Sequence, residues 1–142
     1  MSTALANLRP IAITANGIFA GLGLTITFAA VPALRAAGYS PRAWQALYRR
    51  GAVIGISSIL VSSAAHFTTY YLTLDKRALW CGIISFISAP YTMIFMKPTN
   101  DRLNQLADTS SKEDASQLVE KWAKLQSFRT LAGPLAFLLA VF

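Results

Sequence analysis

Apolar residues form three long runs in the first two thirds of the chain, and a fourth run closes it. An α-helix needs about 20 mainly apolar residues to cross the hydrocarbon core of a bilayer. The pattern predicts spans at about 10–34, 51–73, 78–97 and 128–142, with a polar cytoplasmic segment at about 98–127. We therefore expect an all-α protein, a single transmembrane domain (1–142) folded as a four-helix transmembrane bundle.

The second run carries small, polar and aromatic residues at steps of three and four, so they share one helical face. These positions are Trp44, Tyr48, Gly51, Gly55, Ser58, Ser62, His66, Tyr70 and Thr73. The rest of the helix is apolar and suits lipid, as at Val53, Ile54, Ile56, Ile59, Leu60 and Val61. We expect the polar stripe to face the bundle interior. Ser40 followed by Pro41 is typical of a helix start, so this helix begins before the membrane.

The third run has a similar row of small or polar residues, from Cys81 through Ser85 and Ser88 to Thr92. Pro90 lies inside this run and is expected to kink the helix. Pro98 has no N–H to donate, so we expect it to end the third helix.

Two helix starts are predicted in the polar segment that follows. Thr99 or Asn100 can cap a short helix beyond Pro98. Ser110 and Ser111, before two acidic residues, predict that the last helix begins near residue 112. Gly133 and Pro134 should bend this last helix inside the membrane.

The composition supports membrane localisation. Hydrophobic residues make up 54% of the chain and charged residues only 13%, whereas soluble domains carry about 25% charged residues. The net charge of +7 does not indicate nucleic-acid binding, because the basic residues flank apolar runs as topology determinants do.

The distribution of lysine and arginine predicts the orientation. Arg9, Lys76 and Arg77 lie on the side of the termini. The opposite side holds Arg35, Arg42, Arg49, Arg50, Lys97, Arg102, Lys112, Lys121, Lys124 and Arg129. This asymmetry places the first and third connections in the cytoplasm. We expect an integral protein of the endoplasmic reticulum membrane, with lumenal termini.

Two pairs of glycines, Gly17 with Gly21 and Gly51 with Gly55, have the spacing that allows helices to approach closely. They suit a homo-oligomer as readily as packing inside one bundle.

His66 is the only histidine, and it falls in the middle of a span. An ionisable residue at this depth is a functional candidate. The alternative is an interhelical hydrogen bond to Ser85, Ser88 or Asn16. With one histidine, one cysteine (Cys81) and no acid inside a span, the sequence offers no bis-histidine haem, no di-iron or other carboxylate-held metal site and no internal disulfide.

A second candidate cluster lies at the cytoplasmic rim and consists of Trp44, Tyr48, Asn100, Trp122 and Arg129, with Tyr91 and Thr92 next to it. The alternative is an aromatic belt with snorkelling arginines. Asn100 and Arg129 together suit an anionic or phenolic oxygen. The rise of a helix separates His66 from this rim by roughly 20 Å, so the two candidate sites do not coincide easily.

The run from Met96 to Leu103, with Trp122 and Arg129 before the last span, resembles the DUF1772 family. Fungal members of this family include anthrone oxygenases, also called noranthrone monooxygenases. The resemblance implies that O₂ oxidises the methylene of an anthrone, an aromatic polyketide, to give an anthraquinone, with no metal, flavin or other cofactor. Tricyclic polyketides and O₂ both partition into bilayers, so a bundle open to lipid suits this reaction.

We assign His66 as general base because it is an ionisable residue inside a span. The motifs shared with the family assign Asn100 with Arg129 as holders of the oxyanion. The assigned substrate-binding residues are Trp44, Tyr48, Tyr91, Thr92, Trp122 and Asn16. Two alternatives stay open: a non-catalytic membrane scaffold or lipid-binding protein, and a cofactor-free oxygenase for another phenolic lipid.

Overall fold

The computed structural model describes residues 3–142, with side chains from Asn7 onward. All its regular elements are helical, which confirms the all-α prediction. They are α1 (Thr3–Thr25), the π-helical turn η1 (Ile26–Ala30), α2 (Val31–Ala36), α3 (Pro41–Thr73), α4 (Lys76–Tyr91), the π-helical turn η2 (Thr92–Met96), α5 (Lys97–Asp108) and α6 (Ser116–Val141).

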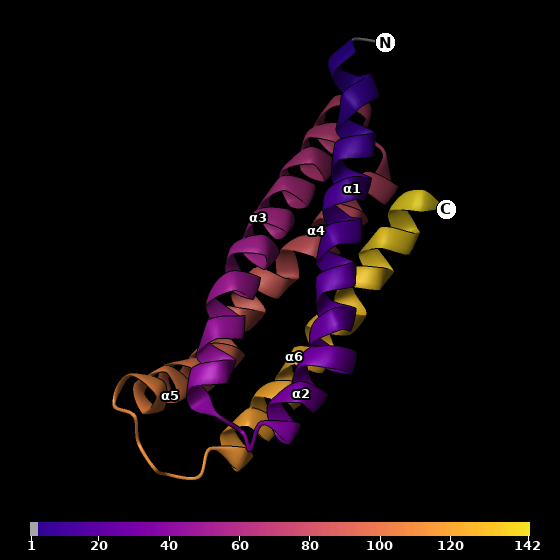
Figure 1. The fold of residues 1–142 in the computed structure, drawn as a ribbon. Coiled ribbons are helices and arrows are strands. Elements are labelled where there is room, and N and C mark those ends of the chain that lie inside the picture. Colours follow the sequence, from indigo (N-terminus) through magenta and orange to yellow (C-terminus); the bar gives the residue numbers. More distant parts are fainter. Residues whose placement is uncertain (1–2) are drawn as a thin grey trace.

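The long helices form an elongated bundle in which α1 packs between α3 and α6, and α4 packs against the same two helices from the other side. The two ends of the chain lie near one end of the bundle (Figure 1). At the other end α5 leans away from the bundle axis, and a loop leads from it to the start of α6 (Figure 1).

Three continuous helices in the described range are long and apolar enough to cross a membrane: Asn7–Ala36, Pro41–Thr73 and Lys76–Asp108. α6 is not among them, because charged residues from Glu120 to Arg129 occupy its first half. Large apolar side chains cover much of the outer surface, including Phe28, Val53, Met93 and Leu131. The structure therefore supports a membrane protein with three apolar helices of spanning length.

The helix ends follow local chemistry where a capping side chain is present. The predicted start of α3 is confirmed, because Ser40 Oγ accepts a hydrogen bond from the backbone N–H of Ala43 and Pro41 occupies the first turn. The turn between α3 and α4 needs only Leu74, in the left-handed region at φ 58°, and Asp75, which accepts from the backbone N–H of Arg77.

The prediction that Pro98 ends the third helix is wrong, because one helix runs from Lys76 to Asp108. The π-helical turn Thr92–Met96 precedes Pro98, and a second one, Ile26–Ala30, precedes Pro32 in the same way. A proline ring clashes with the carbonyl four residues earlier. In both helices that carbonyl lies within the wider π-helical turn, so the chain passes the proline without breaking.

The predicted start of the last helix is also wrong. α6 begins at Ser116, about one turn beyond residue 112, where Asp114 accepts a hydrogen bond from the Ser116 N–H. α6 then continues through Pro134 to Val141. On its first turns Glu120 pairs with Arg35 at 2.7 Å, and this guanidinium lowers the pKa of the exposed carboxyl.

Most of the predicted polar stripe of α3 faces inward, with Gly55, Ser58, Ser62 and His66 buried, but Thr73 at its end is exposed. Ile59 was expected to face lipid, but it is only 3% exposed because it packs on the bundle side.

The close approach of α1 to α6 involves Gly23 and Gly133, which belong to neither of the predicted glycine pairs. A Cβ at Gly133 would lie 3.0 Å from the Ala20 Cα, and one at Gly23 would lie 3.2 Å from the Thr130 Cα. Thr130 also donates a hydrogen bond to the carbonyl of Gly23. These contacts hold the central part of α6 in the bundle, directly beyond Arg129.

Candidate functional site

The guanidinium of Arg129 points from α6 into the space beside α3. Gly55 makes room for it, since a Cβ there would lie 3.2 Å from Arg129 Nη2. Nη1 donates a weak hydrogen bond to Gln126 Oε1 at 3.3 Å, and the guanidinium carbon lies 5.5 Å from the centre of the Phe19 ring. Nε is buried without a partner, and Arg129 has no carboxylate partner in the described part of the chain.

Arg129 lines a cavity of about 240 Å³ between α3 and α4, which we call the Arg129 cavity. Most of its wall is apolar, and Tyr48, Ser88, Thr92 and Arg129 supply polar groups. Its outer wall includes Ile56, Leu60 and Met93, whose side chains are exposed on the outer surface of the bundle. A concave, mainly apolar space with a few converging polar groups is typical of a small-molecule site.

The electrostatic character of this cavity favours a bound anion. An unpaired guanidinium away from bulk water attracts an oxyanion more strongly than one in solvent, and it offers two parallel donors. Ser88 Oγ is also buried without a partner. The Thr92 hydroxyl is used locally, because it donates to the Ser88 carbonyl at 2.8 Å.

The other rim residues support Tyr48 more than they line the cavity. The Trp44 ring stacks on Tyr48 at 4.8 Å between centroids, and Trp122 meets Trp44 edge-on at 5.8 Å. Both tryptophans are buried in the main apolar cluster. Asn100 Nδ2 donates to the Tyr48 hydroxyl at 3.3 Å. The Tyr48 oxygen accepts this bond, so its hydrogen is free to donate into the cavity.

Tyr91 does not line the Arg129 cavity. Its hydroxyl donates to the Leu125 carbonyl at 3.1 Å, and its ring stacks on Phe128 at 4.3 Å. It therefore fixes the position of α4 against α6.

Gln126 is a site residue that sequence reasoning missed. It is buried, contacts Arg129, and lines a small chamber of about 20 Å³ with Trp122, Tyr48 and Arg129. A chamber of this size has room for about one water molecule. The only sequence signal was the spacing of three residues between Gln126 and Arg129, which places both on one helical face.

His66 lies in a separate network within the bundle. Asn16 Nδ2 lies 2.9 Å from His66 Nε2, and Ser85 Oγ donates to Asn16 Oδ1 at 2.9 Å. An amide nitrogen can only donate, so Nε2 accepts and the ring is a neutral imidazole in this arrangement. The structure thus contains the interhelical hydrogen bond that the sequence left open, with Asn16 as its partner.

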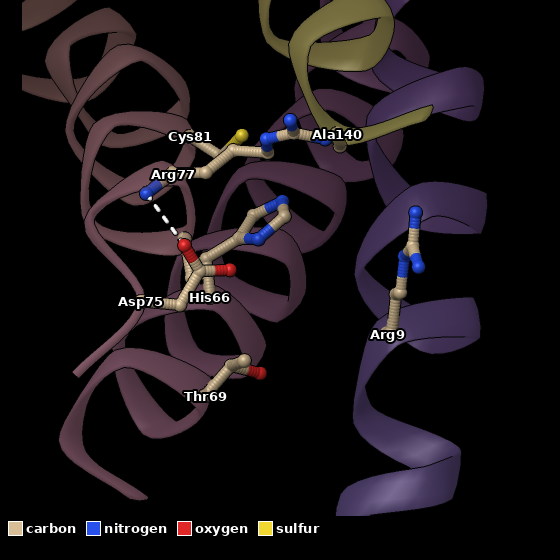
Figure 2. Close-up of a pocket in the computed structure, with 8 residues that line it drawn as sticks. Arg9, His66, Thr69, Asp75, Arg77, Cys81 and Ala140 are labelled. Atoms are coloured by element: carbon tan, nitrogen blue, oxygen red, sulfur yellow. Dashed lines mark hydrogen bonds between the residues drawn. The ribbon is translucent and has the colours of Figure 1, made fainter. Parts of the chain in front are cut away.

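The His66 ring also lines a second cavity of about 310 Å³, which we call the His66 cavity. Its other walls come from α1, α4, α6 and the α3–α4 turn, and Arg9 and Arg77 lie on it from different helices (Figure 2). The His66 cavity and the Arg129 cavity share no lining residue. Gly55, beside Arg129, and His66 are separated by about 16 Å of helical rise.

The structure thus brings Tyr48, Thr92 and Arg129 together, places Asn100, Trp44 and Trp122 behind them, and keeps His66 and Asn16 apart. Over residues 3–142, no group of three or more histidine, cysteine or acidic side chains is arranged to hold a metal ion.

Comparison with known proteins adds evidence of a different kind. A sequence profile of the family described as anthrone oxygenase matches residues 44–139. An anthrone oxygenase of Claviceps purpurea (strain 20.1) is 31% identical over 140 residues, covering 86% of this chain and 79% of the relative. The anthrone oxygenase dmxR16 of Cryptosporiopsis sp. (strain 8999) is 28% identical over 126 residues, covering 82% of this chain and 73% of the relative. No solved structure matches the chain. The profile includes Trp44, Arg129 and most of the walls of both cavities, and the chain belongs to the anthrone oxygenase family.

Proposed function

We propose that this protein is a cofactor-independent monooxygenase that converts an anthrone polyketide to an anthraquinone with O₂ in the Arg129 cavity. One observation carries the proposal: an unpaired guanidinium lines an apolar cavity that opens among lipid-facing side chains. An anthrone becomes a flat aromatic anion when it loses a methylene proton. The cavity offers this anion a positive charge, and apolar walls for its rings.

The reaction balances without an added reductant. Loss of a proton from the methylene carbon gives the anthrolate, which passes one electron to O₂ to form a substrate radical and superoxide. These combine into a carbon–oxygen bond, and protonation gives a hydroperoxide. The hydroperoxide loses water to leave the second ketone, so one oxygen atom enters the product and the other leaves as water.

In this proposal the chain acts by electrostatics and positioning. Arg129 and the Tyr48 hydroxyl hold the developing oxyanion, Asn100 and Trp44 fix Tyr48, and Thr92 belongs to the wall. The described lining residues include no imidazole or carboxylate. The methylene proton therefore passes to water admitted with the substrate, and stabilisation of the anion by Arg129 lowers the free-energy cost of this transfer.

A second candidate places the chemistry at His66, with the imidazole as general base. It is favoured by the position of the ring on its own cavity. Against it, Nε2 already accepts from Asn16, so the ring must first break this bond or shift its proton from Nδ1. The two candidates differ in which variant loses turnover, His66→Ala or an Arg129 variant.

We extend the proposal to the membrane arrangement. The later half of α6, about 128–142, completes a four-span bundle with the three apolar helices. The basic residues of the α2, α5 and early α6 end face the cytoplasm, and the termini face the lumen of the endoplasmic reticulum.

The function is tested by oxygen uptake in membranes that contain the protein and are supplied with emodin anthrone. We expect uptake well above the spontaneous rate, with one O₂ consumed per quinone formed and no effect of a metal chelator. Uptake equal to that of membranes without the protein would contradict the proposal and favour a scaffold or lipid-binding role. Uptake only with other phenolic lipids would favour a cofactor-free oxygenase that acts on one of those lipids.

Gly55→Ala tests whether the position of the guanidinium matters. The new methyl group lies 3.2 Å from Arg129 Nη2, so the guanidinium must shift. We expect turnover to fall about tenfold, because small misplacements of a catalytic group slow a reaction strongly. Gly51→Ala is the matched control, since its methyl group meets only Ile26 at 3.9 Å. Equal turnover in the two variants would contradict the role of Arg129.

A further inference from the structure

The His66 cavity gathers positive charge at the end of the protein that has the fewest basic residues. Only Arg9, Lys76 and Arg77 lie at this end, and two of these three line one cavity. The positive-inside rule explains why basic residues are scarce here. It does not explain why Arg9 from α1 and Arg77 from α4 converge on the same space.

The positive charges of the cavity are only partly cancelled by its other groups. Neither arginine forms an ion pair with a carboxylate in the described part of the chain. The one acid on the wall is Asp75, and it caps α4 by accepting from the Arg77 N–H. His66 is only 5% exposed and neutral in its bond with Asn16, so its unbonded Nδ1–H adds a donor without adding charge. Two guanidinium groups and one carboxylate leave a net charge of about +1.

The depth of the cavity matches the headgroup region of a bilayer. It lies beside the turn that joins α3 and α4, which are two of the three helices of spanning length. Tyr71 and Trp80 flank this turn with exposed side chains, as aromatic residues do at a membrane surface. In the membrane arrangement proposed above, lipid phosphates therefore lie at the level of Arg9 and Arg77.

The composition of the wall suits an amphiphile better than a bare ion. A volume of about 310 Å³ exceeds what one phosphate group fills. Cys81 and Ala140 line the cavity together with the charged groups and Thr69 (Figure 2). Ala78 also belongs to its lining. A phosphate with its glycerol unit would place oxygens against the arginines and carbon against these small side chains.

We propose that the His66 cavity binds the headgroup of an anionic phospholipid, with its phosphate held between Arg9 and Arg77. This site is separate from the Arg129 cavity and does not depend on the proposed oxidation. A bound phosphate would contact both α1, through Arg9, and α4, through Arg77, at the end of the bundle where the α3–α4 turn lies.

The test uses the purified full chain in detergent, titrated with short-chain phosphatidate and with inorganic phosphate by calorimetry. We expect phosphatidate to bind at least about tenfold more tightly than inorganic phosphate, because the glycerol unit fills the cavity. Short-chain phosphatidylcholine should bind more weakly than phosphatidate. Arg9→Gln with Arg77→Gln should lower phosphatidate affinity about 10- to 100-fold, since two charge-assisted contacts are lost.

Lys76→Gln is the matched control, because it removes a positive charge from the same end without altering the cavity wall. We expect it to change affinity less than about twofold. Equal affinity for phosphate and phosphatidate would overturn the lipid assignment. Absence of binding, or equal losses in Lys76→Gln and the double variant, would overturn the site. Anthrone turnover by the double variant should equal that of the original chain, which separates this test from that of the proposed function.

Discussion

Replacement of Arg129 by glutamine is expected to lower anthrone turnover by about 10²- to 10³-fold, the loss typical of removing an oxyanion-stabilising donor. The folded structure should survive. The guanidinium has no carboxylate partner to leave unpaired, and glutamine keeps a polar head in the space that Gly55 provides. The measurement is the rate of quinone formation by purified protein, with the melting temperature recorded on the same sample.

Three further variants define what this loss means. Arg129→Lys keeps the charge but not the planar pair of donors, so turnover should lie between those of the original chain and Arg129→Gln. Arg50→Gln removes an exposed arginine from α3 and should leave turnover unchanged. His66→Ala should lower turnover less than about threefold if the reaction takes place in the Arg129 cavity. Full activity of Arg129→Gln, with a large loss in His66→Ala, would transfer the chemistry to the His66 cavity.

Trp122→Ala is expected to destabilise the fold by about 3–5 kcal/mol, the usual effect of truncating a fully buried tryptophan. Trp122 is only 2% exposed and packs edge-on against Trp44 in the main apolar cluster. Its removal opens a cavity behind Tyr48 at the junction of α3 and α6. Thermal unfolding in detergent should therefore show a clearly lower midpoint.

Trp80→Ala is the matched control for this stability prediction. Trp80 is 58% exposed at the opposite end of the bundle, so its removal should shift the unfolding midpoint only slightly in detergent. If both substitutions lowered the midpoint equally, Trp122 would not be a core residue. If Trp122→Ala lost turnover with an unchanged midpoint, it would act as a substrate wall instead.

The sequence was informative where local chemistry determines the outcome. Ser40 and Pro41 predicted the start of α3, because a capping side chain acts within one turn. The steps of three and four along α3 predicted its buried face, because helical periodicity alone sets which residues share a side. The Asn16–His66 hydrogen bond was among three partners considered, and only the packing of α1 on α3 selects it.

The sequence was less informative about local changes of helical type and about how two segments meet. Pro98 does not end its helix, because the π-helical turn before it relieves the clash between the proline ring and the carbonyl four residues earlier. No residue pattern in the sequence predicted that turn. Gly23 and Gly133 set the contact between α1 and α6 although neither belongs to a regular glycine pair. Trp44 and Trp122 face inward, and an inward position does not distinguish a cavity wall from the core.

The Arg129 cavity opens among Ile56, Leu60 and Met93, so the concentration that controls binding there is the concentration of the ligand in the bilayer. In the proposed membrane arrangement, such a molecule reaches the cavity by lateral diffusion within the bilayer. Occupancy therefore follows its mole fraction among the surrounding lipids and is nearly independent of the aqueous volume. Added lipid that carries no ligand lowers the mole fraction of the ligand in the bilayer and so lowers occupancy. A more hydrophobic ligand saturates the protein at a lower total amount, because more of it partitions into the bilayer.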